Sequence, residues 1–178
     1  MSVLSRLFSR SDPREAARPA YAQVIALGRD PYWYTDGGVA DSVDGRFEAV
    51  ALLLCLVLLR LEQDEDQPAV RQFSVHLAEL FVDDMDGQLR QNGVGDLVVG
   101  KNIGKMMSAL GGRLGVYRAA LAADNTDMSA LDSALRRNLY REEQVADAQV
   151  TAAAAKVRAL HDRMAALPVA DVMQGAIA

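Results

Sequence analysis

The sequence predicts an all-α protein, a single compact domain of about six or seven helices around a buried apolar helix at residues 46–61. Apolar residues recur at the spacing of one helix face along most of the chain. Residues 49–59 are apolar without a break, a run shorter than the ~20 residues that span a membrane and closely bracketed by charges. Such a run should form a central helix that neighbouring helices cover on every side. The one strand candidate, residues 97–99, is too short to change this class.

Length and composition are those of one globular domain. The chain has 178 residues, of which 51% are hydrophobic and 24% charged, so a sizeable core can form. The net charge of −5 argues against general nucleic-acid binding, and we expect no DNA partner. Cys55 is the single cysteine and lies inside the apolar run. A disulfide framework is therefore excluded, and a reducing compartment fits.

We place the folded domain at residues 13–167. Residues 1–12 are a short basic amphipathic tail, which we expect to be frayed; a weak contact with a membrane surface or a partner is the alternative. This segment lacks the continuous apolar region of a secretory signal. The first helix should run from Pro19 to Leu27, because the residue before a proline avoids helical geometry. Pro168 should end the last helix and leave residues 168–178 as a loose tail.

Residues 30–48 lead into the apolar helix. Trp33 lies among aromatic residues beside glycines, which is typical of a loop that closes a core, although a peptide-docking patch is the alternative. The stretch from 41 to 48 should cap the apolar helix. We expect a structural role for its motif residues, Asp41, Asp44, Gly45 and Arg46.

Residues 77–121 should form two helices joined by a glycine-containing bend, and the domain should be organised around them. The first helix has an apolar arc that should face the core. Its members are Phe73, Leu77, Leu80, Phe81, Met85 and Leu89. Asp84 falls inside this arc, whereas Asp83 and Asp86 point to solvent. An unpaired carboxylate turned towards a core costs several kcal/mol, roughly, so we expect Arg113 to pair with Asp84 across the hairpin.

The second helix of the pair covers about residues 101–122 and has two contrasting faces. One face is an apolar stripe made of Ile103, Met106, Met107, Leu110, Leu114, Tyr117 and Leu121. The opposite face is nearly bare, with Gly104, Ser108, Gly112 and Gly115, and it carries the cations Lys101, Lys105 and Arg118. Interior glycines each cost about 0.5–1 kcal/mol relative to alanine. Close approach of another helix should offset this, either from the same chain or from a partner protein.

Two more amphipathic helices should follow, over about residues 128–139 and 144–167. No catalytic motif is complete. Residues 95–102 have the spacing of a phosphate loop, but Asn102 replaces the required Ser or Thr, and a polar helix precedes the loop where a strand is needed. His76 and Glu79 lack the further ligands of a metal site, so we expect no metal and no cofactor. An acid–base role of Asp84 is an alternative that a structural ion pair explains more simply.

Two stretches carry a family resemblance: PYWYTDGGVADSVDGRFEAVALLL and FVDDMDGQLRQNGVGDLVVGKNIGKMMSALGGRLGVY. They resemble the ubiquinol–cytochrome c chaperone family, relatives of the mitochondrial cytochrome b assembly factor, and the resemblance covers about residues 13–139. The short N-terminus is similar to that of the bacterial members. The resemblance implies an all-helical, non-enzymatic helper in assembly of the cytochrome bc1 complex, which binds newly made cytochrome b. Mitochondrial relatives act with a small partner protein near the ribosomal tunnel exit.

The resemblance supplies no catalytic residue. The positions that match its motifs, or lie on the bare face, are candidates for partner contact or for holding the hairpin. They are Asp84, Asp86, Asp96, Lys101, Lys105, Gly112, Arg113 and Arg118. The family implies a location in the bacterial cytoplasm at the inner face of the inner membrane, with peripheral membrane contact; the mitochondrial matrix is the alternative. An alternative function is a ribosome or RNA contact through Lys101, Lys105 and Arg118.

Overall fold

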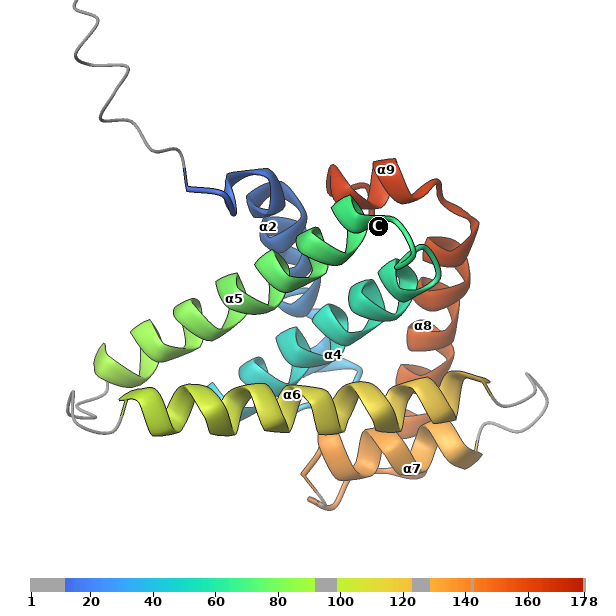
Figure 1. Ribbon diagram of the computed structural model, residues 1–178. Helices are drawn as coiled ribbons and strands as arrows, with labels where there is room; N and C mark the ends of the chain where they lie inside the picture. The colour runs from blue at the N-terminus through green and yellow to red at the C-terminus, as the bar shows by residue number, and fades with distance from the viewer. Residues whose placement is uncertain (1–11, 92–98, 123–128, 142, 178) are drawn as a thin grey trace, which may run out of the picture.

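Helices follow one another along the described part of the chain (Figure 1). The computed structural model describes residues 12–91, 99–122, 129–141 and 143–177, and for residues 89–91 and 99–103 it describes the backbone alone. The elements are, in chain order, η1 (Glu15–Ala17), α2 (Arg18–Gly28), α3 (Tyr32–Thr35), α4 (Val43–Glu62), α5 (Pro68–Gln91), α6 (Val99–Ala122), α7 (Ser129–Asn138), α8 (Asp147–Ala166) and α9 (Val169–Met173). No strand occurs in these ranges, so the all-α prediction is confirmed.

Helix α4 is the centre of the fold. The hydroxyl oxygen of Ser42 caps its start by accepting a hydrogen bond from the backbone N–H of Gly45 at 3.1 Å. Residues 48–61 are all buried, because α2, α5, α6 and α8 pack around this helix. The predicted central apolar helix is thereby confirmed. Within the described ranges, no helix is both long and apolar enough to cross a membrane.

Helices α5 and α6 are the two predicted helices of the hairpin, and they pack on each other and on α4 (Figure 1). The glycine-containing bend predicted between them falls in residues 92–98, outside the described residues. The arc on α5 is confirmed for Phe73, Leu77, Leu80, Phe81 and Met85, which are all buried, while the side chain of Leu89 lies outside the described residues. On α6, Leu110 and Tyr117 are buried, but Met107 is 42% exposed. Its place in the predicted core stripe was wrong, because it lies roughly 60–80° around the helix from those two residues.

Two buried arginines close the C-terminal ends of neighbouring helices. Arg158 of α8 donates from Nη1 to the carbonyl of Leu121 at 2.7 Å, at the end of α6. Arg60 of α4 donates from Nη2 to the carbonyl of Leu167 at 2.8 Å and from Nε to that of Met164 at 3.0 Å, at the end of α8. The last carbonyls of a helix lack partners within it and carry partial negative charge. These guanidinium groups therefore tie α4, α6 and α8 together.

The C-terminal residues pack against the body of the protein. After Pro168, the short helix α9 contacts α2 and α4, and Val172 and Ile177 are fully buried. Gly175 has a φ of 95°, and a side chain there would meet the carbonyl oxygen of Pro19 at 3.2 Å. The prediction of a loose tail at residues 168–178 was therefore wrong.

At the other end, η1 precedes α2, which begins one residue before the predicted start and ends at Gly28. Residues 1–11, and with them nearly all of the predicted N-terminal tail, lie outside the described residues. The carboxylate of Asp12 accepts hydrogen bonds from the backbone N–H and the guanidinium of Arg14. These contacts lower the pKa of Asp12 to about 2.

Candidate partner-binding surface

The loop before α4 is held by aromatic and glycine contacts. Trp33 is fully buried, as expected, and its indole N–H donates to a carbonyl of α2 at 2.8 Å. The hydroxyl of Tyr140 donates to the carbonyl of Gly37 at 2.7 Å and so ties the loop to the end of α7. A Cβ on Gly45 would lie 2.0 Å from the carbonyl oxygen of Ala40. Only glycine therefore lets the loop cross the first turn of α4 this closely.

Phe47, Glu48 and Arg113 form a cluster at the N-terminal end of α4. Arg113 donates from Nε and Nη2 to the two carboxylate oxygens of Glu48 at 2.8 and 2.6 Å. The side chain of Glu48 is only 6% exposed and that of Arg113 17%. The guanidinium carbon of Arg113 also lies 5.5 Å from the centre of the Phe47 ring. Burial raises the pKa of Glu48, and the hydrogen bonds from Arg113 oppose this shift.

Asp84 has a different partner from the one predicted. Its carboxylate accepts a hydrogen bond from the hydroxyl of Tyr21 at 2.9 Å, so the expected Asp84–Arg113 pair was wrong. Burial, together with the charge of Asp84, raises the pKa of Tyr21 and keeps this phenol protonated as a donor. Asp84 is half-buried, whereas Glu48 is buried. Arg113 pairs with the more deeply buried of the two carboxylates, because the free energy cost of leaving a carboxylate without a cation rises with its burial.

Two exposed ion pairs flank this cluster. Arg46 donates from Nε to Asp41 at 2.7 Å, which lowers the pKa of Asp41. Arg141 pairs with Asp44 across the gap between the end of α7 and the start of α4. Exposed pairs of this kind contribute about 0–1 kcal/mol. They orient the loop and the end of α7 and add little stability.

A pocket of about 450 Å³ opens between the start of α4, the middle of α6 and the end of α7. We name it the arginine pocket, and it is lined by Asp44, Phe47, Glu48, Arg113, Arg137 and Arg141. Arg141 has a φ of 53°, in the left-handed region. This conformation costs a non-glycine residue roughly 1–2 kcal/mol. The exposed pair with Asp44 is too weak to offset that cost.

A second pocket, of about 170 Å³, adjoins the first at Phe47, which lines both. We name it the apolar pocket, and its lining residues are Ile25, Arg29, Val43, Arg46, Phe47, Val50, Met85 and Gln88. Val43 is 65% exposed although it is a large apolar residue, while Val50 and Met85 are buried. The start of α4 thus presents apolar surface next to several arginines.

The face of α6 that points away from α4 is uncovered. A methyl group added at any of its four glycines would meet no heavy atom of another described segment within 4 Å. We name this surface the open face; by helical spacing it comprises Gly104, Ser108, Gly111, Gly112, Gly115, Ala119 and Ala122. It is roughly 27 Å long. We predicted that a helix of the same chain or of a partner protein covers these glycines. Within the described ranges, no helix of the same chain covers them.

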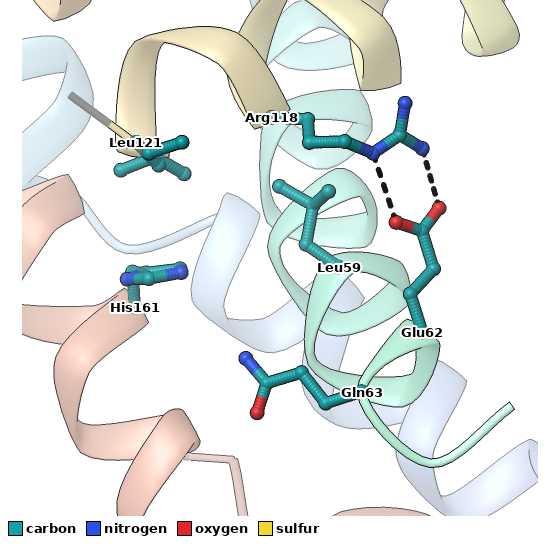
Figure 2. Close-up of a pocket in the computed structure, with 7 residues that line it drawn as sticks. Leu59, Glu62, Gln63, Arg118, Leu121 and His161 are labelled. Atoms are coloured by element: carbon teal, nitrogen blue, oxygen red, sulfur yellow. Dashed lines mark hydrogen bonds and ion pairs between the residues drawn. The ribbon is translucent and has the colours of Figure 1, made fainter.

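The cations near the open face differ in their surroundings. Lys105 is exposed, whereas Arg118 donates from Nε and Nη2 to Glu62 at 3.0 and 2.6 Å (Figure 2). This pair lines one side of a pocket of about 290 Å³, which Leu59, Leu121 and His161 also line. Because Glu62 neutralises Arg118, this residue offers little free charge for a ribosome or RNA contact. The side chain of Lys101 lies outside the described residues.

The remaining predicted candidates also lie in different parts of the molecule. Gly112 belongs to the open face, and Asp86 is half-buried on α5. Asp96 lies outside the described residues. The structure therefore brings Arg113 together with the motif residues at the start of α4, while Asp84, Lys105 and Arg118 lie in separate surroundings.

Four residues of the arginine pocket were not among the predicted candidates: Phe47, Glu48, Arg137 and Arg141. Glu48 could have been found, because a polar residue in a helix that is covered on all sides must face a neighbour. Arg137 and Arg141 gave no such signal. Arg137 reaches the pocket from α7 because this helix packs on α6, and Arg141 reaches it from the turn after α7, where its φ is 53°.

Comparisons with known proteins agree with this fold. The family described as ubiquinol-cytochrome C chaperone matches residues 35–178. Among solved structures, the chain is similar to the crystal structure of the Cbp3 homolog from Brucella abortus, with 28% sequence identity and a TM-score of 0.79. That similarity covers 97% of this chain and 93% of the other. A comparison with curated proteins gives no match.

Proposed function

The chain belongs to the ubiquinol–cytochrome c chaperone family, and we propose that it is a non-enzymatic assembly chaperone of the cytochrome bc1 complex that binds newly made cytochrome b. The family match over residues 35–178 carries this proposal. The contacts of Asp84 support a role without catalysis, because the carboxylate that sequence reasoning singled out as an acid–base candidate is held by Tyr21.

We propose that the client binds to the open face of α6. Its glycines destabilise the helix by about 0.5–1 kcal/mol each, with no covering helix in the described part of the chain to offset them. Helices of membrane proteins pack closely through small residues, so a newly made membrane helix fits such a face. Met107 at its margin is exposed and adaptable. A client that is inserted into the inner membrane places the chaperone at the cytoplasmic side of that membrane.

Deletion of the gene tests the function. We expect the levels of assembled bc1 complex and of cytochrome b to fall, and to recover when the wild-type chain is restored. Other respiratory complexes should keep their levels, which serves as the control. Unchanged cytochrome b in the deletion strain would remove the proposal.

Photo-crosslinking tests the placement of the client separately. A photoreactive amino acid at Ser108, on the open face, should crosslink to newly made cytochrome b in cells. The same amino acid at Ala155, an exposed position of α8, is the matched control and should not crosslink. Equal crosslinking from both positions, or from Ala155 alone, would show that the client sits elsewhere, even where the deletion result stands.

A further inference from the structure

We propose that the arginine pocket and the adjoining apolar pocket together bind a segment of a partner protein in which a carboxylate side chain stands next to a large apolar side chain. This site lies at the start of α4 and is separate from the open face of α6. It does not depend on the identity of the client.

The charges around the two pockets favour an acidic partner. Their linings contain five arginines, of which Arg46, Arg113 and Arg141 pair with Asp41, Glu48 and Asp44. Within the described residues, Arg29 and Arg137 form no ion pair, so the lining keeps an excess of positive charge. The chain as a whole has a net charge of −5, so this excess of positive charge is local. A surface of one sign attracts and orients a partner segment of the other sign.

One guanidinium in the arginine pocket has no partner of its own. Arg113 forms an ion pair with Glu48, and Arg141 forms one with Asp44. Arg137 is exposed, and within the described residues it makes no hydrogen bond and no ion pair. A planar guanidinium presents a fork of donors that matches a carboxylate with two parallel hydrogen bonds. Arg137 is therefore the expected anchor for the incoming carboxylate.

The apolar half of the site favours a peptide over a simple anion. A free phosphate could bind at Arg137 through its charge, but it would leave the exposed side chain of Val43 uncovered. A peptide segment can place a carboxylate at Arg137 and an apolar side chain against Val43 at the same time. A peptide carboxylate therefore fits the two pockets together better than a free phosphate.

Phe47 connects the charged and the apolar halves of the site. Because its ring lines both pockets, a carboxylate at Arg137 places the neighbouring residues of the same segment beside the apolar pocket. Val43 lines the apolar pocket together with the buried Val50 and Met85, and 65% of its surface is exposed. Covering Val43 with a large apolar side chain removes this exposed surface from water.

Fluorescence anisotropy with labelled peptides tests the site. The probes are a panel of twelve-residue peptides that place one Glu one to four positions from a Leu or Phe, and a matched panel with Gln in place of Glu. We expect members of the Glu panel to bind the full chain about ten-fold or more tightly than their Gln twins, since hydrogen bonds between charged groups are strong. Arg137→Gln should remove this preference, and Val43→Ser should weaken both panels.

Arg163→Gln is the matched control, because Arg163 is exposed on α8, which lines neither pocket. It removes the same charge and should leave binding unchanged. Equal binding of the two panels, or equal losses in Arg137→Gln and Arg163→Gln, would overturn the proposal. Displacement of the peptides by inorganic phosphate would indicate a general anion site. Binding to phosphatidylglycerol vesicles that Arg137→Gln abolishes would indicate a lipid site, and either result would also overturn it.

Discussion

Glu48 is the single carboxylate on which the seating of α6 against α4 depends. It lies in the first part of a largely apolar helix, where burial raises its pKa, while the two hydrogen bonds that Arg113 donates favour its charged form. The same guanidinium lies over Phe47, whose ring is 5.6 Å from that of Phe81. One side chain of α6 therefore contacts two residues of α4, and one of these, Phe47, packs against Phe81 of α5.

Replacing Arg113 should be costly. Arg113→Met leaves Glu48 buried without a cation, and we expect the free energy of unfolding to fall by about 3–5 kcal/mol. The double variant Glu48→Met with Arg113→Met should regain most of this loss, because it buries no unpaired charge. Arg118→Met is the control: it removes an exposed pair and should cost less than about 1 kcal/mol. Urea unfolding measures all three, and a loss in Arg113→Met no larger than in Arg118→Met would contradict the assignment.

Cys55 gives a second prediction at this scale. Its side chain is fully buried in α4, and burial raises the pKa of its thiol to about 12. Since the thiolate is the reactive form, the native protein should not react with a thiol reagent such as DTNB at pH 8 within minutes. The unfolded protein should release one equivalent. Rapid reaction of the native protein would show that α4 is less well covered than described.

At the scale of elements, α6 and α4 use glycine for opposite reasons. The glycines of α6 face open space, whereas Gly45 of α4 is in contact with the loop that crosses it. In α6 the missing side chains therefore stabilise nothing within the described chain. In α4 the missing side chain is what allows the loop to close.

The two kinds of glycine should respond differently to alanine. Gly112→Ala should raise the free energy of unfolding by about 0.5–1 kcal/mol, because alanine favours the helix and meets no neighbour. Gly45→Ala should lower it, because its Cβ would lie 2.0 Å from the carbonyl oxygen of Ala40. Gly112→Ala should also reduce crosslinking of cytochrome b from Ser108, if the client packs closely there. If Gly112→Ala is more stable but crosslinks to cytochrome b as strongly as the wild type, the client does not pack closely on the open face.

At the scale of the whole molecule, the sequence predicts the helices better than the contacts between them. Periodicity was sufficient for α5 and α6, because each buries one continuous face, and the unbroken apolar run at residues 49–59 was sufficient for α4. The partner of Arg113 was not predictable from α5 and α6 alone, since the competing carboxylate is on a third helix, α4. Helix α9 left a weak signal, because Val169, Val172 and Met173 have helical spacing, but five residues are too few to stand out.

The sequence predicted one part of the candidate surface, the glycine-rich face of α6, but not the arginine pocket. The open face of α6 can be predicted directly from the helical spacing of its small residues. The arginine pocket depends on the backbone of Arg141 and on how α7 packs on α6, and neither leaves a local pattern. Long-range packing of this kind is the part that spacing within one helix cannot supply.

The connection between the N-terminal part and α8 gives a prediction on pH. Lys156 donates to Asp30 at 2.7 Å, and this contact, with a backbone hydrogen bond from Tyr32, holds the pKa of Asp30 below its usual 3.8. A lowered pKa in the folded state contributes stability above the usual value, and this contribution is lost as pH falls through the folded pKa. Asp30→Asn should therefore lose less stability than the wild type between about pH 5 and 2.

Thermal unfolding across this pH range measures the effect. Asp66→Asn, an exposed change in the connection between α4 and α5, is the control and should follow the wild-type curve. If Asp30→Asn and the wild type lose stability in parallel, the contact with Lys156 does not contribute to folding.

The contact of Arg158 with the end of α6 has a consequence for synthesis of the chain. The carbonyls of Ala120 and Leu121 receive their guanidinium donor from a residue that is translated much later. At about 5–20 residues per second, elongation from position 121 to position 158 takes roughly 2–7 s. During that interval the last turn of α6 lacks the guanidinium that binds its carbonyls in the folded protein.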